Sequence, residues 1–137
     1  MSSAAVDAYP LFSTMPVVLA TKQEIASWTT FHGNIVKAIC WRWGVPMDTP
    51  SALAEANKGF TFDPAKIAVP VLLIIGEGEY KSEEVRRQQE FCMTKLPHPM
   101  KRMVITPSNE GATNHCVMEN RSLVAQVLFD WLDTVFK

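Results

Sequence analysis

The spacing of hydrophobic residues changes after residue 66, and this change divides the chain into two segments. Before that point, apolar side chains recur at roughly helical spacing over residues 22–43. We expect helical structure there, with Gly33 as a candidate break between two helices. A further short helix is expected to begin at Pro50. Residues 15–20 (MPVVLA) fit either a short strand or the start of a helix after the proline, and the pattern leaves both open.

The second segment alternates between strand-like and helix-like patterns. Residues 67–75 (IAVPVLLII) form a nearly unbroken apolar run, which is typical of a strand buried on both faces of a parallel sheet. A turn at residues 76–80 (GEGEY) precedes a helix that Ser82 is expected to cap. Residues 101–106 (KRMVIT) predict a second strand, and residues 120–136 predict a last helix after a loop. This order of strands and helices indicates the α/β class.

Composition and charge narrow the classes of partner. The net charge of −1 provides no basic footprint for a nucleic acid or an anionic membrane. No apolar run reaches the ~20 residues that a membrane-spanning helix needs. The first residues (MSSAAVDAYP) lack the basic start and the apolar stretch of a signal peptide. We therefore expect a cytoplasmic protein with no nucleic-acid partner and no membrane partner.

The three cysteines, Cys40, Cys92 and Cys116, are an odd and widely spaced set with no C-x-x-C pair. This spacing argues against a disulfide framework and against a structural zinc site. We expect Cys40 and Cys92 to lie in the core, because both fall in helical patterns. Cys116 is expected to be a buried thiol. No pattern in the chain predicts a metal ion or a cofactor.

Candidate catalytic side chains follow the two predicted strands. The first strand is followed by the acidic turn Gly76–Glu79, and the second is followed by a loop that contains residues 110–116 (EGATNHC). In an open parallel sheet, ligands bind beyond the carboxyl ends of the strands, and both loops lie at that edge. A carboxylate of the turn is therefore expected to approach His115, where it would fix the tautomer and stabilise an imidazolium.

Residues 67–136 resemble the end of an α/β-hydrolase, which runs from a buried strand through an acidic turn, a helix and a strand to a loop with the catalytic histidine and a final helix. In residues 75–79 (IGEGE), Glu79 stands where the family usually has an aspartate, and His115 stands at the family histidine. The string EGATNHCVMENRSLVAQVLFDWLD resembles the dienelactone-hydrolase-like and dipeptidyl-peptidase-like subgroup, which includes carbon–carbon bond hydrolases of diketones and polyketides. Residues 1–66 then correspond to a helical cap.

This resemblance implies an α/β fold with a partial α/β-hydrolase-type parallel sheet in residues 67–137, preceded by a helical cap-like segment in residues 1–66. It implies that His115 acts as general base and then general acid, and that Glu79 orients it. Glu77 stays open as an alternative acid, because it lies in the same turn. The substrate in the parent enzyme is expected to be a small or medium organic molecule.

The chain departs from the family at the nucleophile. The family serine lies in G-x-S-x-G at a strand-to-helix turn, and none of the six glycines here frames a serine, cysteine or aspartate at that spacing. Since the family order is nucleophile, acid, histidine, the nucleophile and the oxyanion-hole strand are expected upstream of Met1. Two alternatives follow. The chain is either the C-terminal portion of a serine-type hydrolase, inactive alone, or a degenerate or non-catalytic α/β module that self-associates.

The predicted sheet is small, and this bears on association. Only residues 69–75 and 102–106 are convincing strands, with residues 15–20 as a third candidate. A strand that is apolar on both faces needs cover, and an open sheet edge exposes unpaired backbone groups. We therefore expect a homodimer or a complex with a chain that carries the nucleophile.

Overall fold

The structure is a computed structural model, and it describes residues 6–7, 10, 16–49 and 51–137. These residues form two compact units. The helical unit spans Asp7–Thr61, and the α/β unit consists of Phe62–Lys137 together with Val6. The boundary that the sequence predicts, after residue 66, lies a few residues further along the chain. Each unit is described by itself.

The helical unit contains four helices within its described residues, and its core consists of five buried residues. The helices are α2 (Pro16–Leu19), α3 (Lys22–Ser27), α4 (Thr30–Arg42) and α5 (Ala52–Ala56). The core residues are Val18, Val36, Cys40, Leu53 and Ala54. The helical alternative for residues 15–20 is therefore correct for Pro16–Leu19, whereas Met15 lies outside the described residues.

The predicted helix break at Gly33 is wrong, because Gly33 lies inside α4. The break occurs instead at Trp28, whose backbone is extended with φ −66° and ψ 147°. Thr21 fixes the start of α3 by a capping box, in which its hydroxyl accepts from the Glu24 N–H and the Glu24 carboxylate accepts from the Thr21 N–H. The other predicted helix starts at Ala52, and Pro50 lies outside the described residues.

The α/β unit is built on two parallel strands, β1 (Val71–Gly76) and β2 (Lys101–Thr106), in which Leu73 pairs with Met103. The prediction that the first strand begins at residue 67 or 69 is wrong. Pro70 has no N–H to give to a ladder, and the first hydrogen bond toward the β2 segment is donated by Val71, to the Met100 carbonyl oxygen at 3.1 Å. The second predicted strand has the predicted bounds.

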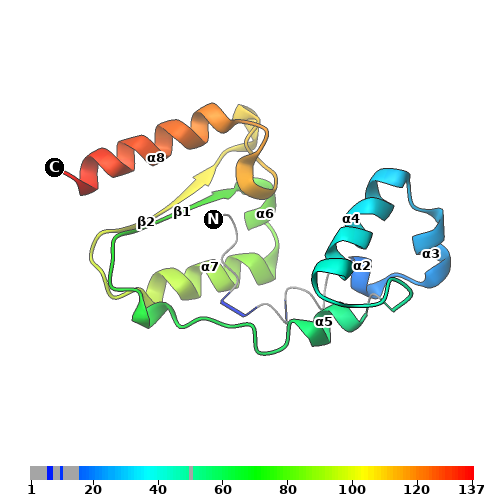
Figure 1. Cartoon of the computed structure of the whole chain (residues 1–137). Coiled ribbons are helices and arrows are strands. Elements are labelled where there is room, and N and C mark those ends of the chain that lie inside the picture. The colour runs from blue at the N-terminus through cyan, green and yellow to red at the C-terminus, as the bar shows by residue number, and fades with distance from the viewer. Residues whose placement is uncertain (1–5, 8–9, 11–15, 50) are drawn as a thin grey trace. The chain divides into compact units, whose positions relative to one another are not determined.

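Two long helices lie on opposite sides of this sheet (Figure 1). They are α7 (Glu83–Lys95) and α8 (Arg121–Val135). Leu73 of β1 forms a core with Cys92 and Leu96 on the α7 side, and Trp131 is the buried residue of α8. The mixed helices and strands and the parallel pairing fit the predicted α/β class. Cys40 and Cys92 are buried, as predicted.

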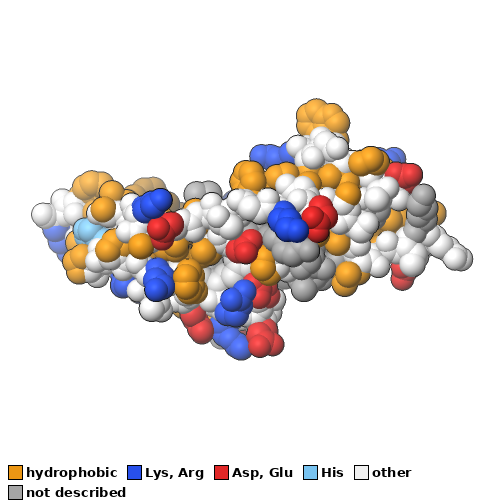
Figure 2. Space-filling model, turned by 90° about the horizontal axis from the view of Figure 1, so that it is seen from below, with side chains coloured by type: hydrophobic (Ala, Val, Ile, Leu, Met, Phe, Trp, Pro, Cys, Tyr) orange, Lys and Arg blue, Asp and Glu red, His pale blue; other side chains and the backbone are white. Residues whose placement is uncertain are grey.

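Apolar side chains also lie at the surface, where Figure 2 shows them between charged groups on one face of the molecule. On α8, Phe129 is 62% exposed and Leu128 is 40% exposed. These two side chains are exposed within the described chain, whereas Trp131 on the same helix is buried. Among the described residues, no helix is both long enough and apolar enough to cross a membrane.

Candidate functional site

The carboxyl ends of β1 and β2 bring the two predicted loops together, as expected for neighbouring parallel strands. β1 runs directly into a single helical turn, α6 (Glu77–Tyr80), which replaces the predicted turn. β2 is followed by two short 3₁₀ helices, η2 (Ser108–Glu110) and η3 (His115–Val117). The buried hydroxyl of Thr106, the last residue of β2, donates to the Ala112 carbonyl oxygen at 2.7 Å. This hydrogen bond folds the loop back over the end of the sheet.

Glu79 and His115 are in direct contact, which confirms the predicted proximity. His115 Nδ1 lies 2.6 Å from Glu79 Oε1. Because a carboxylate only accepts hydrogen bonds, Nδ1 carries the proton in this contact, and Nε2 of the neutral ring is left with its lone pair. The Glu79 side chain is 18% exposed, and that of His115 is 68% exposed. The acid is therefore sheltered while the imidazole is open to solvent.

The contact with His115 is the hydrogen bond that Glu79 makes through its carboxylate, because the second carboxylate oxygen has no partner within the described part of the chain. Oε2 is buried and has no hydrogen-bond partner among the described residues. A buried acceptor without a donor is costly, so His115 provides the principal compensation for the Glu79 charge.

Glu77, the alternative acid, binds a different part of the loop. Its Oε2 accepts from the Ser108 N–H at 2.9 Å and from the Ser108 hydroxyl at 2.7 Å, and its Oε1 lies 3.1 Å from Lys81 Nζ. The hydrogen bonds from Ser108, followed by those from Lys81 and its charge, lower the pKa of Glu77 from 4.5 to about 2. Of the two glutamates in the turn, Glu79 is the one that contacts His115.

Two glycines allow the histidine loop to approach the end of β1. A Cβ atom at Gly76 would lie 2.4 Å from the Thr113 carbonyl oxygen and 2.9 Å from that of Asn114. At Gly78 a Cβ atom would lie 2.6 Å from Thr113 Oγ1. In Gly76–Glu79 the two glycines therefore pack against Thr113, and the two glutamates bind the loop residues Ser108 and His115. The sequence shows this alternation but not the contact.

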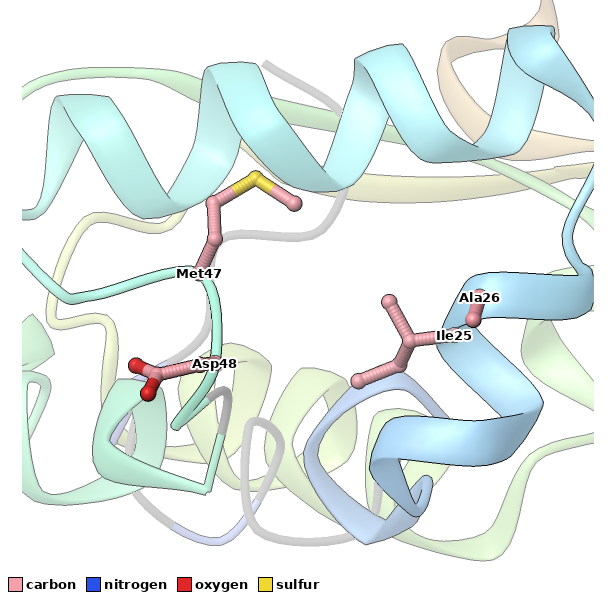
Figure 3. Close-up of a pocket in the computed structure, with 4 residues that line it drawn as sticks. All are labelled: Ile25, Ala26, Met47 and Asp48. Atoms are coloured by element: carbon pink, nitrogen blue, oxygen red, sulfur yellow. The ribbon is translucent and has the colours of Figure 1, made fainter.

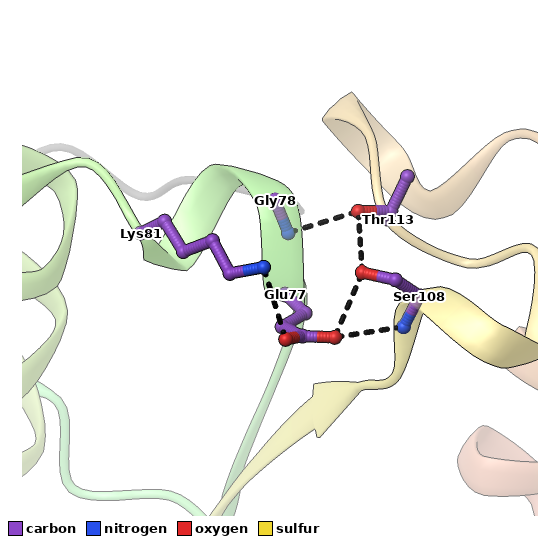
Figure 4. A network of polar contacts seen from close by, with 5 residues as sticks. All are labelled: Glu77, Gly78, Lys81, Ser108 and Thr113. Atoms are coloured by element: carbon purple, nitrogen blue, oxygen red, sulfur yellow. Dashed lines mark hydrogen bonds and ion pairs between the residues drawn. The ribbon is translucent and has the colours of Figure 1, made fainter.

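Figure 4 shows the polar contacts that join α6 to the loop. Thr113 Oγ1 accepts from the Gly78 N–H at 3.0 Å and lies 3.0 Å from Ser108 Oγ. The sequence contains no motif that marks Ser108, Thr113 or Lys81 as site residues. Ser108 and Thr113 are small hydroxyl residues in a loop, a composition common to many loops, so no pattern marked them.

The loop backbone is left-handed at three positions. Gly111 has φ +62°, as its residue type predicts, but Cys116 (φ +63°) and Val117 (φ +49°) are not glycines. Val117 is 1% exposed, whereas Cys116 is exposed. The prediction of a buried Cys116 thiol is therefore wrong, because the turn at these residues places Val117 rather than Cys116 in the interior.

The start of α8 is tied to the same loop. The Asn114 N–H, next to His115, donates to Glu119 Oε1 at 3.0 Å. Asn120 donates from Nδ2 to the Glu110 carbonyl oxygen at 2.8 Å, and its Oδ1 caps α8 by accepting from the Leu123 N–H at 3.1 Å. These hydrogen bonds join the loop around His115 to the residues at the start of α8.

The described residues also include cavities away from Glu79 and His115, but no candidate metal site. No group of three or more histidine, cysteine or acidic residues within the described part of the chain is placed to hold a metal ion. A cavity of about 240 Å³ in the helical unit is lined by Ile25, Ala26, Met47 and Asp48 (Figure 3). None of these four is a predicted site residue. Comparisons with protein-family models, with curated proteins and with solved structures found no match.

Proposed function

We propose that this chain supplies the acid and the histidine of a serine-type α/β-hydrolase whose nucleophile is provided by another segment or chain. The observation that carries the proposal is the 2.6 Å contact between Glu79 and His115 Nδ1 at the carboxyl edge of a parallel sheet. An acid that holds Nδ1–H leaves Nε2 as the base, and this is the arrangement that activates a hydroxyl nucleophile.

In the proposed reaction, His115 Nε2 takes the proton of a serine hydroxyl as that oxygen attacks the carbonyl carbon of the substrate. The ring then carries a positive charge, which Glu79 stabilises. As the C–O bond of an ester or the C–C bond of a diketone breaks, His115 gives the proton to the leaving alkoxide or carbanion, which departs as an alcohol or a ketone. Water, deprotonated by His115, then hydrolyses the acyl-serine and returns the serine hydroxyl. The substrate class is a small organic molecule with an electrophilic carbonyl group.

The serine closest to this arrangement in the described contacts does not serve as that nucleophile. The Ser108 hydroxyl donates its proton to Glu77. A carboxylate whose pKa lies near 2 is too weak a base to activate a serine at neutral pH. The absence of a G-x-S-x-G motif in all 137 residues leads to the same conclusion.

The alternative is a non-catalytic α/β module that self-associates. The observation that favours it is the exposed apolar surface of α8, with Phe129 62% exposed. Apolar surface of this kind is common at protein interfaces. It does not by itself separate the alternatives, because a hydrolase half would also bind the remainder of its sheet.

The two functions can be separated with a fluorophosphonate probe, which labels activated serines. The native gene is expressed in its own cells with a C-terminal tag, and the tagged material is isolated and labelled. We expect labelling of a polypeptide that contains this chain or stays bound to it, and we expect His115→Ala to abolish the labelling.

His98→Ala is the matched control, because His98 accepts a local hydrogen bond from the Met100 N–H and does not contact Glu79. Labelling should survive in this variant. If no serine is labelled in the native material, or if labelling survives His115→Ala, the hydrolase proposal fails and the non-catalytic module is favoured.

A further inference from the structure

We propose that Glu77, Ser108 and Thr113 form a clamp that sets the orientation of His115, and that Glu77 is a positioning residue for the Glu79–His115 pair. The catalytic purpose of the clamp rests on the proposed function, whereas its effect on His115 is a separate and measurable property. Glu77 does not touch His115 in this scheme and acts through the loop between them.

The hydrogen bonds of the clamp have only one consistent direction. Ser108 donates its hydroxyl proton to the Glu77 carboxylate, which can only accept. A hydroxyl has a single proton, so Thr113 must be the donor in its 3.0 Å contact with Ser108. Thr113 Oγ1 in turn accepts from the Gly78 N–H. The chain of donors therefore starts in α6, crosses the loop and returns to α6, and such chains strengthen each bond by polarisation.

The charge at the end of this chain is constant over the physiological range. Hydrogen bonds from Ser108, together with Lys81, hold the pKa of Glu77 near 2, so the carboxylate stays ionised. Hydrogen bonds to an ionised acceptor are stronger than those between neutral groups. Figure 4 shows Lys81 and Ser108 on opposite oxygens of the Glu77 carboxylate, so both oxygens are engaged.

The clamp reaches His115 through Thr113, which lies two residues before it. The Thr113 carbonyl oxygen accepts from the Glu79 N–H at 3.3 Å, and its backbone lies against Gly76. The Thr113 side chain is held by Gly78 and Ser108. Thr113 is therefore fixed on both its backbone and its side chain by the same helical turn that carries Glu79. Glu79 and the loop that carries His115 are therefore held by the same helical turn, α6.

The readout is the tautomer of His115, measured by ¹⁵N NMR of the whole chain at a pH at which the ring is neutral. The contact with Glu79 favours the Nδ1–H form, so an imidazole that leaves its position shows a mixture of tautomers. Thr113→Val removes the hydroxyl while keeping the shape of the side chain, and Thr113→Ser keeps the hydroxyl. Glu77→Ala removes the end of the chain of donors.

We expect the ratio of the Nδ1–H to the Nε2–H tautomer to fall roughly two- to tenfold in Thr113→Val and Glu77→Ala, which is the change expected when one hydrogen bond is lost. Thr113→Ser should keep the native ratio. Glu84→Ala is the matched control for charge removal, because Glu84 pairs with Arg87 on α7 and has no contact with the loop. Glu79→Ala removes the contact with Nδ1 and so gives the tautomer ratio of His115 without its acid.

The clamp proposal is overturned if Thr113→Val and Glu77→Ala keep the native ratio while Glu79→Ala changes it. Should Thr113→Val fail to fold, Ser108→Ala tests the same chain of donors and leaves the backbone hydrogen bond of residue 108 to Glu77 in place. The tautomer needs no nucleophile. Failure of the serine labelling would therefore remove the hydrolase and leave the clamp, whereas an unchanged ratio would remove the clamp and leave the hydrolase.

Discussion

Replacing Gly76 with alanine tests whether close packing at the end of β1 positions the histidine loop. Gly76 has φ −70° and ψ 141°, a conformation that alanine adopts without strain. Reduced freedom of the unfolded chain would then stabilise the protein by about 0.4–1 kcal/mol. Opposing this, the new Cβ atom would lie 2.4 Å from the Thr113 carbonyl oxygen and 2.5 Å from its carbonyl carbon. Ordinary contacts begin at 3.4 Å.

The clash outweighs the gain, because both crowded atoms belong to the backbone and cannot rotate away. Relieving it requires a shift of roughly 1 Å, and overpacking of this kind costs about 1–3 kcal/mol. We therefore expect a lower free energy of unfolding for the α/β unit. A shift of that size in the loop would lengthen the contact between Glu79 and His115 from 2.6 Å toward roughly 3.6 Å, which is beyond a hydrogen bond.

The assay is a urea titration followed by NMR cross peaks of the α/β unit, together with the tautomer of His115. Gly33→Ala is the control, because no atom lies within 4 Å of a Cβ at Gly33 inside α4. There the substitution should stabilise the helix by about 1 kcal/mol. A Gly76→Ala variant with an unchanged or higher unfolding midpoint and a native His115 tautomer would refute the close-packing argument.

Three further predictions concern charge and chemistry. His115→Ala should lower the free energy of unfolding by about 1–3 kcal/mol, because it leaves the Glu79 carboxylate without its donor. In a double-mutant cycle, adding Glu79→Ala should recover part of that loss, and strictly additive effects would contradict the pairing. Glu77 has a lowered pKa in the folded state, so its stabilising effect should be complete above pH ~4.5 and should fade as the pH falls toward about 2. Urea midpoints of the native chain and of Glu77→Gln should therefore converge in acid, and a constant difference would argue against the Ser108 hydrogen bonds as the cause. The pure chain should not hydrolyse an activated ester at an enzymatic rate; turnover that disappears in His115→Ala would reveal a nucleophile within the chain, with Cys116 to be replaced first.

The elements that the sequence predicts best are those with a strong local signal. Residues 101–106 form the predicted strand, and α8 lies within the predicted range because Asn120 is a good N-cap. The predicted start of β1 lies too early, because the apolar run continues through Pro70, which has no N–H for a strand ladder. The predicted break at Gly33 is wrong because glycine is tolerated inside a helix, whereas the capping box at Thr21 is a local signal that marks the start of α3.

The site was predictable in part for a related reason. The proximity of Glu79 and His115 follows from the geometry of parallel strands, since residues after neighbouring strands share an edge of the sheet. The role of Glu77 depends on hydrogen bonds to Ser108, which is 31 positions away along the chain. The orientation of Cys116 depends on two left-handed residues that are not glycines. No local sequence pattern predicts the hydrogen bonds of Glu77 to Ser108 or the left-handed backbone at Cys116.

The two glutamates of the turn after β1 bind different residues of the loop. Helical geometry separates successive side chains around α6, so Glu77 and Glu79 cannot meet the loop at the same point. Glu77 binds the loop where it leaves β2, and Glu79 binds it at the histidine. A single carboxylate would have to fix the loop and compensate the imidazole at once. With two carboxylates, Glu77 holds the loop in its ionised form down to a pH near its lowered pKa of about 2, while Glu79 stays in contact with His115.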